Sequence, residues 1–306
     1  MTNSSVALSR PAAHWRHPAL TRHAPVIVVV LALIAVWYVA AVLMNIGLVR
    51  DAFQRQEIHY TIGDLISASL NAKRPLLPAP HQILATFAVD VFGWPVTSPR
   101  SLVYHSWVTL SATFVGFLIG AAFGIVLAVL IVHLRTLQKS LLPWIIGSQM
   151  VPILAVAPIV IVVLGSIGLR GLLPKSIISA YLSFFPVTIG MVKGLNSPDP
   201  IQRDLMRTWS ATPAQIFWKL RWPSAVPFLF ASLRVSVTIS LIGAIVGELP
   251  TGAQAGIGAR LLAGSYYGQT VQIWAALLAA SLLAAGLVGL VGLTERLVQR
   301  RMGAQP

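Results

Sequence analysis

Ionisable side chains are scarce in this chain, and where they gather, their spacing suits docking rather than bond-making chemistry. The densest group lies in the stretch DLMRTWSATPAQIFWKLRWPSAVP, residues 204–227, and comprises Asp204, Arg207, Lys219 and Arg221. The sequence has no H-E-x-x-H metal motif, no G-x-S-x-G nucleophile motif and no pair of carboxylates central in an apolar run. With no cysteine, it can form no disulfide, thiolate metal site or cysteine nucleophile. We therefore expect no catalytic, metal or cofactor site in this chain.

Two short helices are predicted in and just before this polar stretch. Each begins with a capping residue, a proline at the first helical position and a glutamine at the third: Asp199, Pro200 and Gln202, then Thr212, Pro213 and Gln215. Pro223 is expected to end the second helix and to open the following apolar run. The pattern thus predicts two capped helices beside a membrane-length segment.

The first of these helices carries an apolar stripe that needs a cover. Ile201, Leu205 and Trp209 recur at every fourth residue, while Arg203 and Asp204 fall on other faces. The stripe could pack on the ends of the chain's own membrane spans. It could equally dock into a groove of a soluble partner. Periodicity alone leaves both interpretations open.

Composition places the chain in a membrane. Of its 306 residues, 56% are hydrophobic and only 10% are charged, and the mean hydropathy is +0.79. Soluble domains carry about 25% charged residues, so the lipid bilayer is the expected surrounding. The net charge of +14 would suggest nucleic-acid binding in a soluble protein. In a membrane protein it indicates basic cytoplasmic loops instead, and no nucleic-acid partner is expected.

Six apolar runs are long enough to span a bilayer as helices, which predicts an all-α membrane protein. They are Pro25–Gly47, Ser106–His133, Leu141–Gly165, Pro174–Leu195, Pro223–Leu249 and Val271–Leu293. The first follows three arginines but is too long for a cleaved signal sequence, so we expect an uncleaved anchor.

The basic residues favour cytoplasmic N- and C-termini. With the N-terminus inside, the inner segments hold 13 Lys and Arg residues and the outer segments hold eight. Most of the outer ones lie in one long loop, where the positive-inside rule weakens. The polar segment around Asp204 is then the longest cytoplasmic loop.

Residues 204–223 resemble the cytoplasmic signature of permease subunits of bacterial ATP-binding-cassette (ABC) importers. That signature reads E-A-A, three residues, G, nine residues, I, one residue, L-P. The matching positions here are Asp204, Leu205 and Met206, then Ser210, Leu220 and Trp222-Pro223. The spacing fits throughout, while Asp for Glu, Leu-Met for Ala-Ala and Ser for Gly depart from the pattern. Further likeness covers about residues 76 to 300 and is closest to permeases for nitrate, taurine, aliphatic sulfonates and pyrimidine-type thiamine precursors.

The resemblance implies a transport subunit, not an enzyme, with the fold of a type I importer permease, about six spans and a short cytoplasmic coupling helix. It would form the path for a small polar solute by alternating access in the bacterial inner membrane. Implied partners are a second permease, with a homodimer favoured and a paralogue left open, two ATP-binding subunits that hold ATP and Mg²⁺, and an extracytoplasmic solute-binding protein. The coupling positions would be Asp204, Leu205, Met206, Arg207, Trp209, Ser210, Thr212, Leu220 and Pro223.

Four polar residues in the spans are candidates for the translocation path: Gln149, Tyr181, Thr188 and Glu248. Each of the first three could instead make an interhelical hydrogen bond. Glu248 lies at the outer end of its span and could have a solute or gating role. Its role could instead be structural, such as a salt bridge with Arg260, or it could simply face water. An ion-coupled secondary transporter is the alternative function, but no acid is central in any span.

The domain plan is a cytoplasmic tail at 1–24, a first span at 25–47, an extracytoplasmic loop at 48–105, a five-helix core at 106–298 containing the coupling loop 196–222, and a cytoplasmic tail at 299–306. In the loop, Ile83, Leu84, Phe87 and Val91 form a stripe that predicts an interfacial helix. In the core, Gly116, Gly120 and Gly124 form a ridge for close helix packing, either within the subunit or across a dimer.

Overall fold

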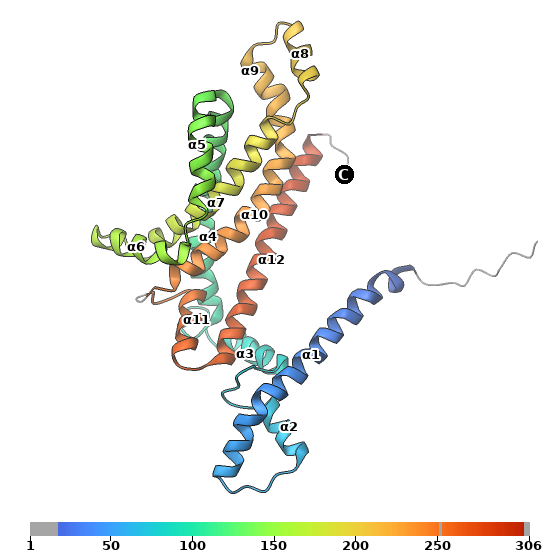
Figure 1. The fold of residues 1–306 in the computed structure, drawn as a ribbon, viewed down its shortest axis with the longest axis vertical. Helices are drawn as coiled ribbons and strands as arrows, with labels where there is room; N and C mark the ends of the chain where they lie inside the picture. The colour runs from blue at the N-terminus through green and yellow to red at the C-terminus, as the bar shows by residue number, and fades with distance from the viewer. Residues whose placement is uncertain (1–17, 251–252, 303–306) are drawn as a thin grey trace, which may run out of the picture. The chain divides into compact units, whose positions relative to one another are not determined.

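The computed structural model describes residues 18–250 and 253–302, and its elements are helices throughout (Figure 1). Residues 1–17 and 303–306, most of the two predicted tails, lie outside the described residues, as does Gly252. In chain order the helices are α1 Pro18–Arg55, α2 Ile62–Leu70, α3 Pro80–Phe92, α4 Leu102–His133, α5 Arg135–Ser148, α6 Ile153–Ser166, α7 Leu172–Leu195, α8 Pro200–Thr208, α9 Pro213–Ile216, the π-helix η1 Phe217–Arg221, α10 Trp222–Glu248, α11 Ile257–Tyr266 and α12 Thr270–Arg301.

Among the described residues, five helices are long and apolar enough to cross a membrane, which agrees with the predicted all-α, multi-span fold. The predicted third span is different. Residues 135–166 form two helices, α5 and α6, that bend by 97° at a short break. Pro152 lies in that break, and a proline removes a helical hydrogen bond and disfavours helical backbone at the preceding Val151. The pair is therefore a broken span or a re-entrant loop.

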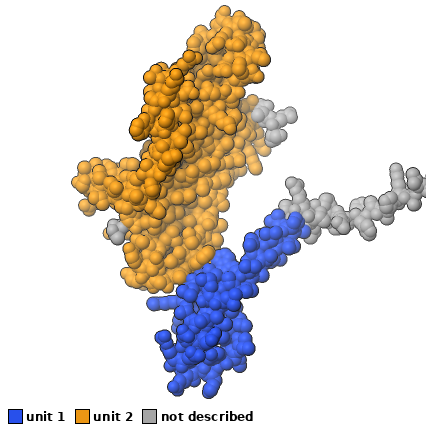
Figure 2. Space-filling view, viewed as in Figure 1, with its two compact units in different colours: residues 1–80 blue, residues 81–306 orange. Residues whose placement is uncertain are grey.

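The chain divides into two compact units, residues 1–80 and 81–306 (Figure 2). In the first unit, α1 continues past the predicted end at Gly47 to Arg55. The buried side chain of Asn45 ties α1 to the segment after α2: its amide nitrogen donates to the Leu77 carbonyl at 2.8 Å, and its amide oxygen accepts from the Leu76 N–H at 2.8 Å. A fully bonded amide of this kind fixes the loop to the helix.

The helix α2 was not predicted, and a local motif explains it. The Thr61 hydroxyl accepts from the Asp64 N–H at 3.3 Å, and the Asp64 carboxylate accepts from the Thr61 N–H at 3.0 Å. This is a capping box. The hydrogen bonds from the Thr61 hydroxyl and backbone lower the pKa of the exposed Asp64 carboxyl.

The second unit is built on α4, α7 and α10, and small residues let these helices approach closely. A Cβ atom added to Gly124 would lie 2.7 Å from the Phe184 carbonyl of α7. One added to Gly116 or Gly120, also on α4, would collide with serines of α7. The glycine ridge therefore packs within the subunit. Ser240 on α10 adds a hydrogen bond of 2.9 Å to the Thr113 carbonyl on α4.

The helices α9, η1 and α10 run on without a break as one membrane-length helix, Pro213–Glu248. The prediction that Pro223 ends the second short helix is therefore wrong. The Trp222 N–H bonds to the Phe217 carbonyl, five residues back, and this wider π-helical turn accommodates the proline that follows it. Phe217 and Trp222 also pack against the core formed by α4, α7 and α10.

The helix α3 follows the predicted stripe only in part. Ile83 is buried, and Phe87 and Val91 pack against a cluster that includes Leu102, while Leu84 is 59% exposed. Helices α3, α4, α11 and α12 thus meet in one apolar cluster.

Candidate functional site

The polar segment around Asp204 forms an exposed projection at one end of α10, opposite to the end that carries α11 (Figure 1). Both predicted capping boxes are confirmed, one at Asp199 with Gln202 and one at Thr212 with Gln215. These bonds satisfy backbone groups that a short helix would otherwise leave unpaired. The segment is therefore held in shape locally, by residues three apart.

The apolar stripe of α8 is uncovered in this single chain. Ile201 is 75% exposed, Leu205 53% and Trp209 76%, and no residue of α8 is buried. The stripe therefore does not pack on the ends of the chain's own spans. Beside it, Arg207 and Asp204 form an exposed ion pair of 3.3 Å, too open to water to stabilise the helix much.

Ser210 explains why the permease signature places a glycine here. Its φ is +56°, in the left-handed region that side chains disfavour. Its N–H donates to the Arg207 carbonyl at 2.9 Å, and the Ala211 N–H donates to the Met206 carbonyl at 3.0 Å. This is the Schellman arrangement that ends a helix. Leu220 and Pro223, also predicted as coupling positions, lie in η1 and at the start of α10.

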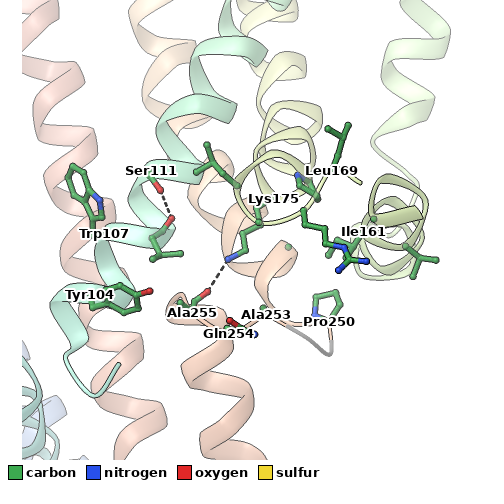
Figure 3. A pocket seen from close by; sticks show the side chains of 18 residues that line it. Tyr104, Trp107, Ser111, Ile161, Leu169, Lys175, Pro250, Ala253, Gln254 and Ala255 are labelled. Atoms are coloured by element: carbon green, nitrogen blue, oxygen red, sulfur yellow. Dashed lines mark hydrogen bonds between the residues drawn. The ribbon is translucent and has the colours of Figure 1, made fainter. Parts of the chain in front are cut away.

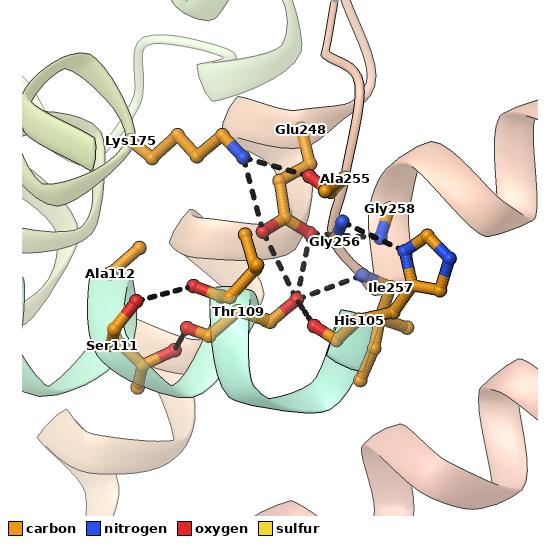
Figure 4. A network of polar contacts seen from close by, with 12 residues as sticks. His105, Thr109, Ser111, Ala112, Lys175, Glu248, Ala255, Gly256, Ile257 and Gly258 are labelled. Atoms are coloured by element: carbon orange, nitrogen blue, oxygen red, sulfur yellow. Dashed lines mark hydrogen bonds and ion pairs between the residues drawn. The ribbon is translucent and has the colours of Figure 1, made fainter. Parts of the chain in front are cut away.

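A second polar cluster lies at the other end of α10, around the fully buried side chain of Glu248 (Figure 4). The Glu248 carboxylate accepts from the Thr109 hydroxyl of α4, at 3.0 Å to Oε1 and 2.9 Å to Oε2, and from the Gly258 N–H of α11 at 2.9 Å. The Lys175 ammonium of α7 lies 3.6 Å from Glu248 Oε1. One carboxylate thereby joins α4, α7, α10 and α11.

The turn that leads into α11 is bound to the same cluster. Lys175 donates to the Ala255 carbonyl at 2.9 Å, and the Gly256 N–H lies 3.1 Å from His105 Nδ1. Gly256 has φ +125°, and a Cβ atom there would overlap the Glu248 carboxylate. Only a glycine lets the backbone pass this close.

Of the two alternative interpretations of Glu248, the water-facing position is wrong, and the salt bridge is present with a different partner. The carboxylate is 0% exposed, so it does not face water. Its ionic partner is Lys175 and not Arg260, which pairs with Asp90 at 3.2 Å. Helix packing decides which cation pairs with which acid, because α3, which carries Asp90, and α11, which carries Arg260, contribute to the same apolar cluster.

A cavity of about 900 Å³ lies directly beside the buried cluster (Figure 3). Residues of α4, α6, α7 and α10 and of the segment after α10 line it. Its charged side chains are Arg170 and Lys175, and aromatic side chains on α4 include Trp107. Lys175 is thus shared: it lines the cavity and contacts Glu248.

The other polar candidates do not gather at this cavity. The Tyr181 hydroxyl donates to the Ser148 carbonyl at 2.6 Å, the interhelical bond expected of it. The Thr188 hydroxyl bonds within its own helix, to the Phe184 carbonyl at 2.9 Å. Gln149 lies at the break between α5 and α6, and its buried Nε2 has no hydrogen-bond partner in the described part of the chain. None of the three lines the cavity, whereas Glu248 reaches it through Lys175.

Sequence reasoning missed Lys175, Arg170, Thr109 and His105. Lys175 and Arg170 are both among the eight basic residues assigned to the outer segments, although Arg170 precedes the predicted span Pro174–Leu195 and Lys175 lies at its start. A lysine at a span end, facing a glutamate at the same end of another span, is a signal that could have found the pair.

Comparisons with known proteins agree with this architecture. Residues 120–304 match the family described as binding-protein-dependent transport system inner membrane component. The chain is 32% identical over 182 residues to a probable ABC transporter permease protein of Haemophilus influenzae, covering 60% of this chain and 72% of the relative. It is 31% identical to the formylaminopyrimidine transport permease protein of Halalkalibacterium halodurans, over 63% of this chain and 72% of the relative.

A third relative, the riboflavin transport system permease protein of Chloroflexus aurantiacus, is 32% identical over 228 residues, covering 74% of this chain and 80% of the relative. Sulfonate and nitrate permeases match more distantly. These matches confirm the resemblance drawn from residues 204–223 and from the spans, and they indicate a multi-pass inner-membrane transport subunit. The chain belongs to the binding-protein-dependent transport system inner membrane component family, the permease subunits of ABC importers.

Proposed function

We propose that α8 and the turn at Ser210 are the surface on which an ATP-binding subunit docks, and that this contact drives the transport cycle. The observation that carries the proposal is the uncovered stripe of Ile201, Leu205 and Trp209 on a helix with no buried residue. A short amphipathic helix with regularly spaced apolar anchors suits insertion into a groove of a partner protein. The exposed Asp204 and Arg207 would orient it there.

The assembly we propose contains two copies of this chain, two ATP-binding subunits and one extracytoplasmic solute-binding protein. ATP and Mg²⁺ bind to the ATP-binding subunits, whose closure moves α8. The N- and C-termini and α8 face the cytoplasm, which is supported by the 13 basic residues of the inner segments against eight outside. The spans then expose the path for a small polar solute alternately to the two sides.

The test is a double substitution on the proposed docking surface, Asp204→Ala with Trp209→Ala. The complex is reconstituted in liposomes with its ATP-binding subunit and binding protein, and uptake of the binding protein's ligand is measured together with ATP hydrolysis. We expect uptake to fall by at least about tenfold, because an exposed tryptophan anchor at an interface contributes about 2 kcal/mol or more. Hydrolysis should also lose its stimulation by the binding protein.

Glu248→Gln is the matched control at the other end of α10. It leaves the α8 surface unchanged, so the ATP-binding subunit should co-purify as with the unsubstituted chain. Unimpaired uptake in the α8 double variant would refute the proposal. Loss of the ATP-binding subunit from the Glu248→Gln variant would refute the separation of the two ends.

A further inference from the structure

The walls of the cavity beside Glu248 carry an excess of positive charge. Of the 18 residues that line it, Arg170 and Lys175 are cationic and none is acidic. In the described part of the chain, Arg170 forms no ion pair, and its side chain is exposed. Arg170 is thus a cation that the cavity's own residues do not neutralise.

Lys175 is only partly neutralised. Its ammonium donates to the Ala255 carbonyl at 2.9 Å and lies 3.6 Å from Glu248, which is outside ordinary hydrogen-bond length. The Glu248 carboxylate takes its shorter bonds from Thr109 and Gly258. An ammonium group has three N–H donors, so Lys175 retains donor capacity toward the cavity.

The three ionisable side chains at and beside the cavity have a net positive charge. With Glu248 ionised, Arg170, Lys175 and Glu248 together carry a net charge of +1. A cleft lined by one sign of charge attracts the opposite sign, so the site is complementary to a single negative charge. The start of α7 at Leu172 also lies on the cavity wall, where the helix dipole adds positive potential.

The opposite wall is suited to a flat or apolar group. Tyr104, Trp107 and Val108 of α4 line it, and Trp107 is 68% exposed (Figure 3). The volume of about 900 Å³ is at the upper end of the range of small-molecule sites. There is room for an organic body beside the charged wall.

We infer that this cavity binds a small organic monoanion, with Arg170 as its main ionic contact, Lys175 as a second donor, and Tyr104 and Trp107 against its apolar part. This inference rests on the proposed function, because it assigns the cavity to the transport path. Lys175 is shared with Glu248, so an anion in the cavity competes for the ammonium. Occupancy then loosens the tie between α7, α10 and the turn at residues 255–258.

The test measures binding of benzenesulfonate to the full-length chain, co-purified with its ATP-binding subunit, in phosphatidylcholine nanodiscs by calorimetry. We expect benzenesulfonate to bind and the uncharged benzamide to bind at least about tenfold more weakly, since it lacks the charge-assisted contact. Arg170→Gln should weaken benzenesulfonate binding by a similar factor. Arg170 is exposed and unpaired, so this variant should fold normally.

Arg100→Gln is the control: Arg100 is an exposed cation that lies on Trp94 and does not line the cavity. It should leave binding unchanged. Equal binding of benzamide and benzenesulfonate, or full binding by Arg170→Gln, would overturn the inference. A lipid headgroup has the same anionic chemistry, so nanodiscs with phosphatidylglycerol form a second arm. Retention of phosphatidylglycerol that depends on Arg170 and resists benzenesulfonate would overturn the assignment to a solute.

The competition between the anion and Glu248 for Lys175 is tested separately, by hydrogen exchange. Benzenesulfonate should speed hydrogen exchange at the Gly258 amide, which bonds to Glu248. Unchanged exchange in the bound state would overturn the competition. If anion binding fails while the α8 variant still abolishes uptake, this inference falls and the proposed function stands. If anion binding is observed and the α8 variant transports normally, the anion site stands and the proposed docking function falls.

Discussion

The two ends of the α10 helix are built in opposite ways. At the α8 end, the bonds that set the structure join residues three to five apart, and the side chains are exposed. At the Glu248 end, the bonds join residues from 10 to 151 positions apart, among them Thr109 with Glu248, and both of these side chains are buried. A locally built, exposed segment can meet a partner without changing the fold. A buried cluster of distant residues makes the fold depend on each of its members.

The largest difference should appear when one carboxylate is removed at each end. Glu248→Ala removes the negative charge that faces the Lys175 ammonium. Breaking a buried ion pair in this way destabilises a protein by about 3–5 kcal/mol. Asp204→Asn removes an exposed pair and should cost less than about 1 kcal/mol. Thermal unfolding of both variants in detergent measures the difference. Equal effects would show that the contrast between the two ends is wrong.

A second contrast concerns the backbone, where each end has a residue with positive φ. Gly256→Ala places a methyl group on the Glu248 carboxylate and imposes a disfavoured φ, so we expect a loss of at least about 2 kcal/mol. The control is Gly286→Ala, because nothing lies within 4 Å of a Cβ atom there. Unfolding in detergent should separate the two. If the Gly256→Ala variant were as stable as the control, the close approach of the turn at Gly256 to the Glu248 carboxylate would be wrong.

The smallest effect is expected at Ser210, and it has the opposite sign. Ser210→Gly relieves a left-handed conformation that costs a side chain about 1 kcal/mol, so the variant should be slightly more stable and should still transport. Ser210→Val should lower both stability and uptake. Because an isolated turn contributes little to global unfolding, limited proteolysis at residues 208–213 is the more sensitive measurement. Faster cleavage of the glycine variant would contradict the proposed strain.

This contrast also explains what could be predicted from the sequence. Both capping boxes around Asp199 and Thr212 were predicted correctly, because capping depends on residues three apart. Glu248 is a candidate from the sequence, but Arg260, the example offered as its ionic partner, is not the partner found, since the choice between two cations depends on how helices pack. Similarly, the apolar character of residues 141–165 was clear, while the bend at Pro152 was not.

The unbroken run from Pro213 to Glu248 has a geometric consequence. It is 36 residues long, so at about 1.5 Å per residue it is a rod of about 54 Å. Rotating such a rod by about 5° about one end displaces the other by about 5 Å. That displacement exceeds the 3.6 Å between the Lys175 ammonium and the Glu248 carboxylate. A small tilt of α10 is therefore enough to separate the two charges at its Glu248 end.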